Sequence, residues 1–253
     1  MHRIARAEHA LLIGSVLPVV LALGASALAA PSPAGGPTPP PAKAEDWPGK
    51  GNVGVPGGWN QRRDGFWKDR KKDQNAVVFF GDSITEGWGS LAHDFKKLKV
   101  ANRGISGDTS RGLLFRLQED VLDLHPRAVS MLIGTNDLGI GSSPADVASN
   151  IKEILDAIAK LKPAPPVVVC HVMPRGAMPG LFPEKIKELN TLIDALVKDR
   201  KAVAICDTWT IFAQPDGACR ADEFPDMLHP NAAGYAKWTA ALTPVLARLG
   251  VMP

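Results

Sequence analysis

Apolar and polar residues alternate in blocks along the chain. Five short segments that are β-branched or nearly continuous in apolar character predict strands buried on both faces of a sheet: residues 76–80, 99–102, 128–133, 166–172 and 202–206. Between them, apolar residues recur at helical spacing and predict helices over residues 109–118, 144–161, 183–197 and 231–249. Another helix is expected to begin near Trp59. Because strands and helices alternate, the pattern predicts an α/β fold, with a parallel sheet covered by helices on both faces.

Polar segments follow the predicted strands. Ser83 follows the first strand, residues 104–107 follow the second, residues 134–137 follow the third, and His229 lies in the loop before the last helix. Sites in open α/β sheets form at the carboxyl ends of the strands. We therefore expect these four segments at one edge of the sheet.

Ser83, Asp226 and His229 are the residue types of a serine hydrolase. A serine hydroxyl is a weak nucleophile that needs a base, and the base needs a partner that fixes its tautomer. Of the six histidines, only His229 has a carboxylate three residues before it. The loop Asp226-Met-Leu-His229-Pro230 can supply acid and base together if it bends both side chains to one side.

The oxyanion formed during ester hydrolysis needs preorganised donors. Candidates are the backbone N–H groups of Ser83 and Gly107 and the side-chain amide of Asn136, since a missing Cβ lets the Gly107 backbone approach a ligand. Each segment also has a structural interpretation. Ser83 to Glu86 has capping-box spacing, Asn136 suits an Asx-turn, and residues 81–85 lack the second glycine of a Gly-x-Ser-x-Gly elbow. Four such segments at one edge favour the catalytic interpretation.

The four segments resemble the sequence blocks of the SGNH (GDSL-type) hydrolases. The blocks occur in the family's order: Gly-Asp-Ser at 81–83, Ser-Gly-Asp-Thr at 106–109, Gly-Thr-Asn-Asp at 134–137 and Asp-x-x-His-Pro at 226–230. The similarity extends from about Trp59 to Leu249. In detail the chain is similar to the branch of platelet-activating-factor acetylhydrolase catalytic subunits, through residues 102–109, 112–117, 173–176 and 207–208.

This resemblance implies a fold and a set of roles. The implied fold is a three-layer α/β/α flavodoxin-like sandwich around a five-stranded parallel sheet. Ser83 would be the nucleophile, His229 the general base, and Asp226 the residue that orients His229. The N–H groups of Ser83 and Gly107 and the side chain of Asn136 would form the oxyanion hole. The segment 175–182 is expected to reshape the acyl pocket.

The N-terminus resembles an export signal. Arg3 and Arg6 precede an apolar run over residues 10–23, and Ala27-Leu-Ala29 fits a small-x-small cleavage site. We expect a signal peptide over residues 1–29, with an uncleaved membrane anchor as the alternative. A Pro/Gly-rich extended linker over 30–58 and a hydrolase domain over 59–253 would follow.

Composition bears on three other features: nucleic-acid binding, disulfide bonds and metal sites. The chain has 253 residues, 45% of them hydrophobic, and a net charge of +3 without long blocks of like charge, which argues against a nucleic-acid partner. The three cysteines form no disulfide framework: Cys170 and Cys206 suit core positions, and a Cys206–Cys219 bridge remains open. No Cys/His spacing resembles a metal site, and no cofactor is expected.

Together these features predict an exported serine esterase. It would hydrolyse short acyl esters, preferentially O-acetyl groups on carbohydrates or small glycosides, through an acyl-enzyme on Ser83. Two alternatives stay open: a lysophospholipase or thioesterase that acts on longer chains, and a non-catalytic ligand-binding module. The sequence does not decide the oligomeric state.

Overall fold

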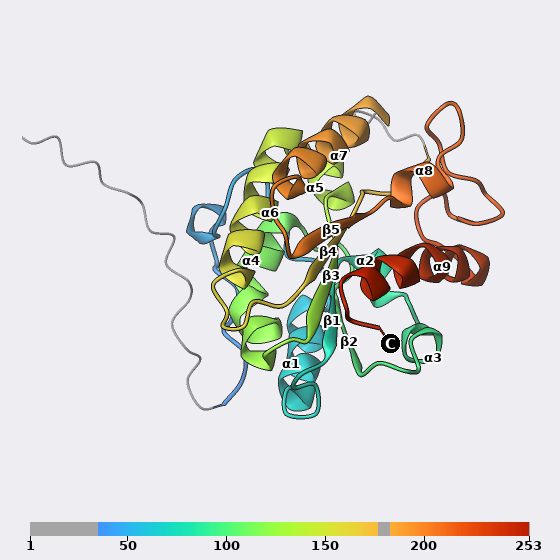
Figure 1. Cartoon of the computed structure of the whole chain (residues 1–253). Helices are drawn as coiled ribbons and strands as arrows, with labels where there is room; N and C mark the ends of the chain where they lie inside the picture. The colour runs from blue at the N-terminus through green and yellow to red at the C-terminus, as the bar shows by residue number, and fades with distance from the viewer. Residues whose placement is uncertain (1–34, 177–182, 253) are drawn as a thin grey trace, which may run out of the picture.

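A central sheet of five parallel strands organises the chain (Figure 1). The computed structural model describes residues 35–176 and 183–252. The strand order is β2-β1-β3-β4-β5. The strands are β1 (Val77–Gly81), β2 (Val100–Gly104), β3 (Ala128–Leu132), β4 (Val167–Cys170) and β5 (Val203–Cys206). The predicted signal segment, residues 1–29, lies outside the described residues.

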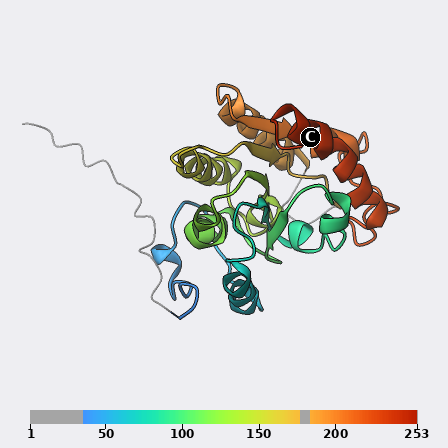
Figure 2. The same ribbon diagram turned by 60° about the horizontal axis from the view of Figure 1, so that its bottom comes forward.

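Helices cover both faces of this sheet (Figures 1 and 2). The longer helices are α1 (Trp59–Asp69), α4 (Ser110–Asp120), α6 (Pro144–Ile158), α7 (Pro183–Val197) and α9 (Ala232–Arg248). The short ones are α2 (Ser83–Glu86), α3 (Leu91–Asp94), α5 (Thr135–Gly139) and α8 (Thr208–Phe212), with 3₁₀ turns η1 (Ala44–Asp46) and η2 (Leu122–Leu124). No helix among the described residues is both long enough and apolar enough to span a membrane.

Successive side chains of β1 point to opposite faces of the sheet and pack into two separate hydrophobic cores. Val78 and Phe80 of β1 pack in one core with apolar residues of α4, α6 and α7. Val77 and Phe79 point to the other face and pack with Trp88, α3 and α9. Strands that are buried on both faces read as continuous apolar runs, which is why the sequence revealed them. The predicted α/β/α sandwich with a five-stranded parallel sheet is confirmed.

One predicted strand is longer than the observed one. The apolar run over 166–172 continues past Cys170, but β4 ends there. The Val172 N–H instead donates to the Asn190 Oδ1 of α7 at 2.8 Å, and the Val172 carbonyl accepts from Asn190 Nδ2 at 3.0 Å. The chain therefore leaves the sheet at Val172, although Val172 and Met173 are apolar and buried.

The residues before Trp59 do not form a free extended linker over their described part. Trp47 is buried against Trp59 and Phe115, with ring centroids 5.8 and 5.1 Å away. The Arg111 guanidinium of α4 donates to four carbonyl oxygens of this segment. We call residues 44–56 the N-terminal strap. The domain boundary at Trp59 stays a prediction, but the strap packs on the domain.

The bridge between Cys206 and Cys219 that the sequence left open is absent, since all three cysteines are free thiols. Cys206 instead lies opposite Cys170 in the register of β4 and β5. Burial raises the pKa of the Cys170 thiol, and the neighbouring Cys206 adds to the effect. Both side chains belong to the core.

Candidate active site

Ser83 stands where β1 turns into the one-turn helix α2. The helix cap is the preceding residue, Asp82, whose Oδ1 accepts from the Ile84 N–H at 2.9 Å. The capping-box interpretation of Ser83 and Glu86 is therefore wrong, because the Glu86 carboxylate binds Ser106 instead. Ser83 occupies the first helical position, half-buried, with its hydroxyl directed to His229.

The loop before α9 bends back on itself. Asp226 Oδ1 accepts from the backbone N–H groups of Leu228 at 3.0 Å and His229 at 2.7 Å. Met227 adopts the left-handed conformation, with φ at 62°, which is rare for a residue with a side chain. This turn brings the Asp226 carboxylate and the His229 ring to the same side, which lets one loop supply both groups.

Ser83, His229 and Asp226 form a hydrogen-bonded chain. His229 Nδ1 lies 2.6 Å from Asp226 Oδ2, and His229 Nε2 lies 2.8 Å from Ser83 Oγ. A carboxylate only accepts hydrogen bonds, so Nδ1 carries the proton of the neutral imidazole. Nε2 is then an acceptor for the Ser83 hydroxyl proton. This is the arrangement that nucleophilic catalysis by serine requires.

Asp226 is suited to remain ionised while it supports His229. Hydrogen bonds from the His229 backbone and side chain lower the pKa of Asp226 to about 2. Its side chain is 57% exposed, so water as well as the loop solvates the charge. The carboxylate is therefore negative at every pH at which an imidazole can act as a base.

The predicted oxyanion donors follow the carboxyl ends of β1, β2 and β3. The N–H groups of Ser83 and Gly107 have no acceptor among the described residues. Gly107 has φ at +78°, and a Cβ there would lie 2.9 Å from Pro56 Cβ of the N-terminal strap, so both conformation and packing favour glycine. Asn136 Nδ2 donates to the Asp108 carbonyl at 2.9 Å, beside Gly107. Asn136 therefore lies beside Gly107, and their segments follow β3 and β2, the two strands that pair with β1. That they form an oxyanion hole with Ser83 stays a prediction.

Three buried carboxylates lie beneath this edge: those of Asp82, Asp108 and Asp137. Burial raises the pKa of Asp82 to about 7 and that of Asp137 to about 6, and the neighbouring carboxylates add to both shifts. Burial also raises the pKa of Asp108, against the pull of Arg116. No pattern in the sequence indicated that these three aspartates lie together.

Arg116 is the buried cation of this cluster. It is fully buried and donates to Asp108 Oδ2 at 2.7 Å, Asp120 Oδ2 at 3.2 Å and the Gly81 carbonyl at 2.9 Å. Gly81 ends β1, two residues before Ser83. Arg116 thus ties α4 to the end of the strand that precedes Ser83. Arg116 lies at helical spacing from the buried Leu113 and Asp120, although an arginine in a helix is ordinarily a surface residue.

No group of three or more histidine, cysteine, aspartate or glutamate side chains with metal-binding geometry occurs in the described ranges. The segment 175–182, expected to reshape the acyl pocket, is described only through Gly176. There the Gly176 N–H donates to the Met227 carbonyl at 2.7 Å, and Arg175 Nη1 donates to Thr135 Oγ1 at 3.2 Å. The start of this segment therefore touches the loop that holds Asp226 and His229.

Comparison with known proteins agrees with this geometry. The GDSL-like Lipase/Acylhydrolase family matches residues 79–237. Platelet-activating factor acetylhydrolase IB subunit alpha1 of Rattus norvegicus is 31% identical over 225 residues, which cover 86% of this chain and 90% of that protein.

Solved structures share the fold. A GDSL-like lipase of Bacteroides thetaiotaomicron superposes with a TM-score of 0.63 at 29% identity, over 70% of this chain and 90% of that one. An acetyl-xylooligosaccharide esterase of Geobacillus superposes with a TM-score of 0.56 at 21% identity, over 70% and 95%, and shows a common fold only. The chain therefore belongs to the GDSL-like lipase/acylhydrolase family and is an ester-cleaving hydrolase.

Proposed function

We propose that this protein is an exported serine esterase that removes short acyl groups, above all O-acetyl groups, from carbohydrates or small glycosides. The observation that carries the proposal is the 2.8 Å approach of His229 Nε2 to Ser83 Oγ, with Asp226 behind the imidazole. The similarity to acetylhydrolase subunits supports the acetyl preference. The leader-like N-terminus supports an extracytoplasmic substrate.

The reaction follows from the hydrogen-bonded chain. Ser83 Oγ attacks the ester carbonyl carbon while His229 Nε2 takes the hydroxyl proton. The N–H groups of Ser83 and Gly107 and the Asn136 amide stabilise the negative oxygen. The intermediate collapses to the acyl-serine, and the leaving alcohol takes its proton from His229. Water, activated by the same imidazole, then hydrolyses the acyl-enzyme and restores Ser83.

The test is the initial rate of the purified protein on p-nitrophenyl esters from acetyl to dodecanoyl, beside Ser83→Ala. The proposal predicts activity confined to short acyl groups and lost in the variant, followed by release of acetate from acetylated sugars. Rates that peak at long chains would move the assignment to lipid or thioester hydrolysis. A folded protein without turnover or serine labelling would indicate a binding module instead.

Export is tested separately. When the whole chain is expressed in a host with a secretory pathway, the mature protein should begin at Ala30 and leave the cytoplasm. N-terminal sequencing of the purified protein measures this. A protein that keeps its leader and sediments with membranes would favour the anchored alternative.

A further inference from the structure

The two backbone donors of the proposed oxyanion hole belong to different segments. The Ser83 N–H begins α2, and the Gly107 N–H lies in the loop after β2. Oxyanion stabilisation depends on donors that are held in place before the reaction. The contacts between α2 and this loop therefore determine how well the hole is preorganised.

The base of the loop is tied to α2 by close backbone packing. A Cβ on Gly104 would lie 2.1 Å from the Glu86 backbone nitrogen, so the two backbones touch. Asn102 Nδ2 donates to the Thr85 carbonyl at 2.7 Å, and its Oδ1 accepts from the Gly104 N–H at 2.9 Å. These contacts stop at Gly104, three residues before the donor at Gly107.

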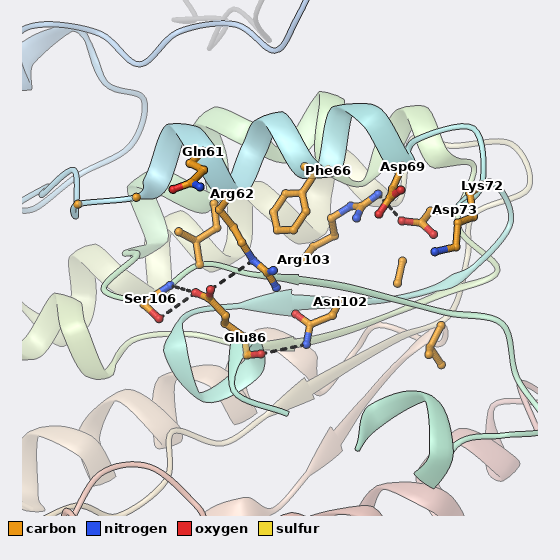
Figure 3. Close-up of a pocket in the computed structure, with 16 residues that line it drawn as sticks. Gln61, Arg62, Phe66, Asp69, Lys72, Asp73, Glu86, Asn102, Arg103 and Ser106 are labelled. Atoms are coloured by element: carbon orange, nitrogen blue, oxygen red, sulfur yellow. Dashed lines mark hydrogen bonds and ion pairs between the residues drawn. The ribbon is translucent and has the colours of Figure 1, made fainter. Parts of the chain in front are cut away.

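The Glu86 side chain reaches the tip of the loop. Its Oε2 accepts from the Ser106 N–H at 2.5 Å and from the Ser106 hydroxyl at 2.8 Å. Arg62 of α1 lies 3.4 Å from Glu86 Oε1 and donates through Nε to the Gly104 carbonyl at 3.1 Å. Figure 3 shows Arg62, Glu86 and Ser106 meeting at one end of a groove.

This groove lies between α1 and the edge strand β2 (Figure 3) and has a volume of about 680 Å³. Its lining includes Arg62, Glu86 and Ser106 but not Ser83 or His229. The Glu86 carboxylate can therefore be approached through this groove, which Ser83 and His229 do not line. A small anion in the groove can take its place without entering the substrate site.

We propose that Glu86, oriented by Arg62, is a positioning residue of the oxyanion hole. The Gly107 N–H belongs to the planar peptide that begins at Ser106, so a carboxylate that fixes Ser106 restrains that N–H. The same Glu86 ends the helix whose first residue is Ser83. One side chain thus sets the separation between both backbone donors. This inference rests on the proposed serine esterase function.

The test compares Glu86→Ala with Glu86→Gln on p-nitrophenyl acetate. We expect Glu86→Ala to lower kcat by about 10- to 100-fold with little change in KM, because only the transition state carries the oxyanion. Glu86→Gln keeps one acceptor for Ser106 and should lose less. Formate should partly restore Glu86→Ala, since Arg62 and the open groove remain. Gln61→Ala, an exposed groove residue, is the matched control and should keep the wild-type kcat.

Three results would overturn the positioning role: a wild-type kcat in Glu86→Ala, a loss confined to KM, or a loss that formate does not change at any concentration. Thermal melts of both variants show whether the fold is retained. A wild-type protein that neither turns over acetyl esters nor labels at Ser83 would instead overturn the proposed function and, with it, this inference.

Discussion

Among individual residues, two hydrogen bonds hold the candidate site together: His229 to Asp226 and His229 to Ser83. Ser83, His229 and Asp226 could be predicted because their chemistry is specific and a short loop carries two of them. Glu86 and Arg116 could not, because a glutamate at the end of a helical turn and an arginine in a helix are ordinarily solvated. Only the fold shows that Glu86 accepts from Ser106 and that Arg116 is buried against the end of β1.

Asp226→Asn tests the role of the carboxylate behind the imidazole. The amide N–H can donate to an unprotonated Nδ1, which favours the tautomer of His229 that carries its proton on Nε2 and cannot accept the Ser83 proton. We expect kcat to fall by about 10²- to 10⁴-fold with KM nearly unchanged. Steady-state kinetics on p-nitrophenyl acetate measure this. Asp222→Asn, an exposed aspartate nearby whose carboxylate pairs with Arg220, is the control, and equal kcat values in the two variants would contradict the account.

Asp82→Asn tests the buried carboxylates. The pKa of Asp82 is raised from 3.8 to about 7, so the folded protein holds this proton more tightly than the unfolded chain. Stability should therefore fall as the pH rises from about 4 to about 7. The substituted amide would still accept from the Ile84 N–H but cannot ionise. We expect the variant to gain a few degrees in Tm over the wild type at pH 8. The gap should close near pH 4; a gap independent of pH would contradict the assignment.

Among the elements, the strands and the long helices could be predicted from apolar runs and from the helical spacing of apolar residues. The one-turn helices α2, α5 and α8 could not, since a single turn shows no repeat at 3.6 residues. Yet α2 and α5 carry Ser83 and Asn136. These two residues could be located through sequence motifs but not through periodicity. The tight packing of α2 on Gly104 could not be predicted, because it depends on how β1 and β2 pair in the sheet.

Gly104→Ala tests that packing. The added methyl group would collide with the Glu86 backbone, which cannot move as a flexible side chain does. We expect the free energy of unfolding to drop by about 1–3 kcal/mol, with a loss of kcat. Gly65→Ala is the matched control: it lies in α1 with open space around it and should stabilise the protein by about 0.5–1 kcal/mol. Urea unfolding of both compares the signs, and a stable Gly104→Ala would refute the close contact.

Over the whole molecule, the N-terminal strap adds a packed segment before the alternating strands and helices of the domain. Proline and glycine predicted an extended linker, because those residues lack helix and strand signals. The strap packs instead through backbone carbonyls that Arg111 binds, and through Trp47. It also brings Pro56 against Gly107 of the proposed oxyanion hole. Such contacts are made by a distant helix and leave no local pattern.

Arg111→Met tests the attachment of the strap. The variant leaves the carbonyls of residues 44, 47, 48 and 51 without their donor, and we expect a loss of about 2–4 kcal/mol in unfolding free energy. Trypsin should cut faster at Lys43 and Lys50 within or next to the strap. Mass spectrometry of the early fragments measures this. Arg127→Met, at an exposed arginine, is the control, and equal cleavage rates would show that Arg111 does not hold the strap.

The proposed function requires that Ser83 be an activated nucleophile. Intact-protein mass spectrometry after brief treatment with a fluorophosphonate, followed by peptide mapping, tests it directly. We expect one adduct, located on Ser83, that forms quickly in the wild type and not in Ser83→Ala or His229→Ala. A folded wild-type protein that gains no adduct, or gains it on another residue, would contradict the account.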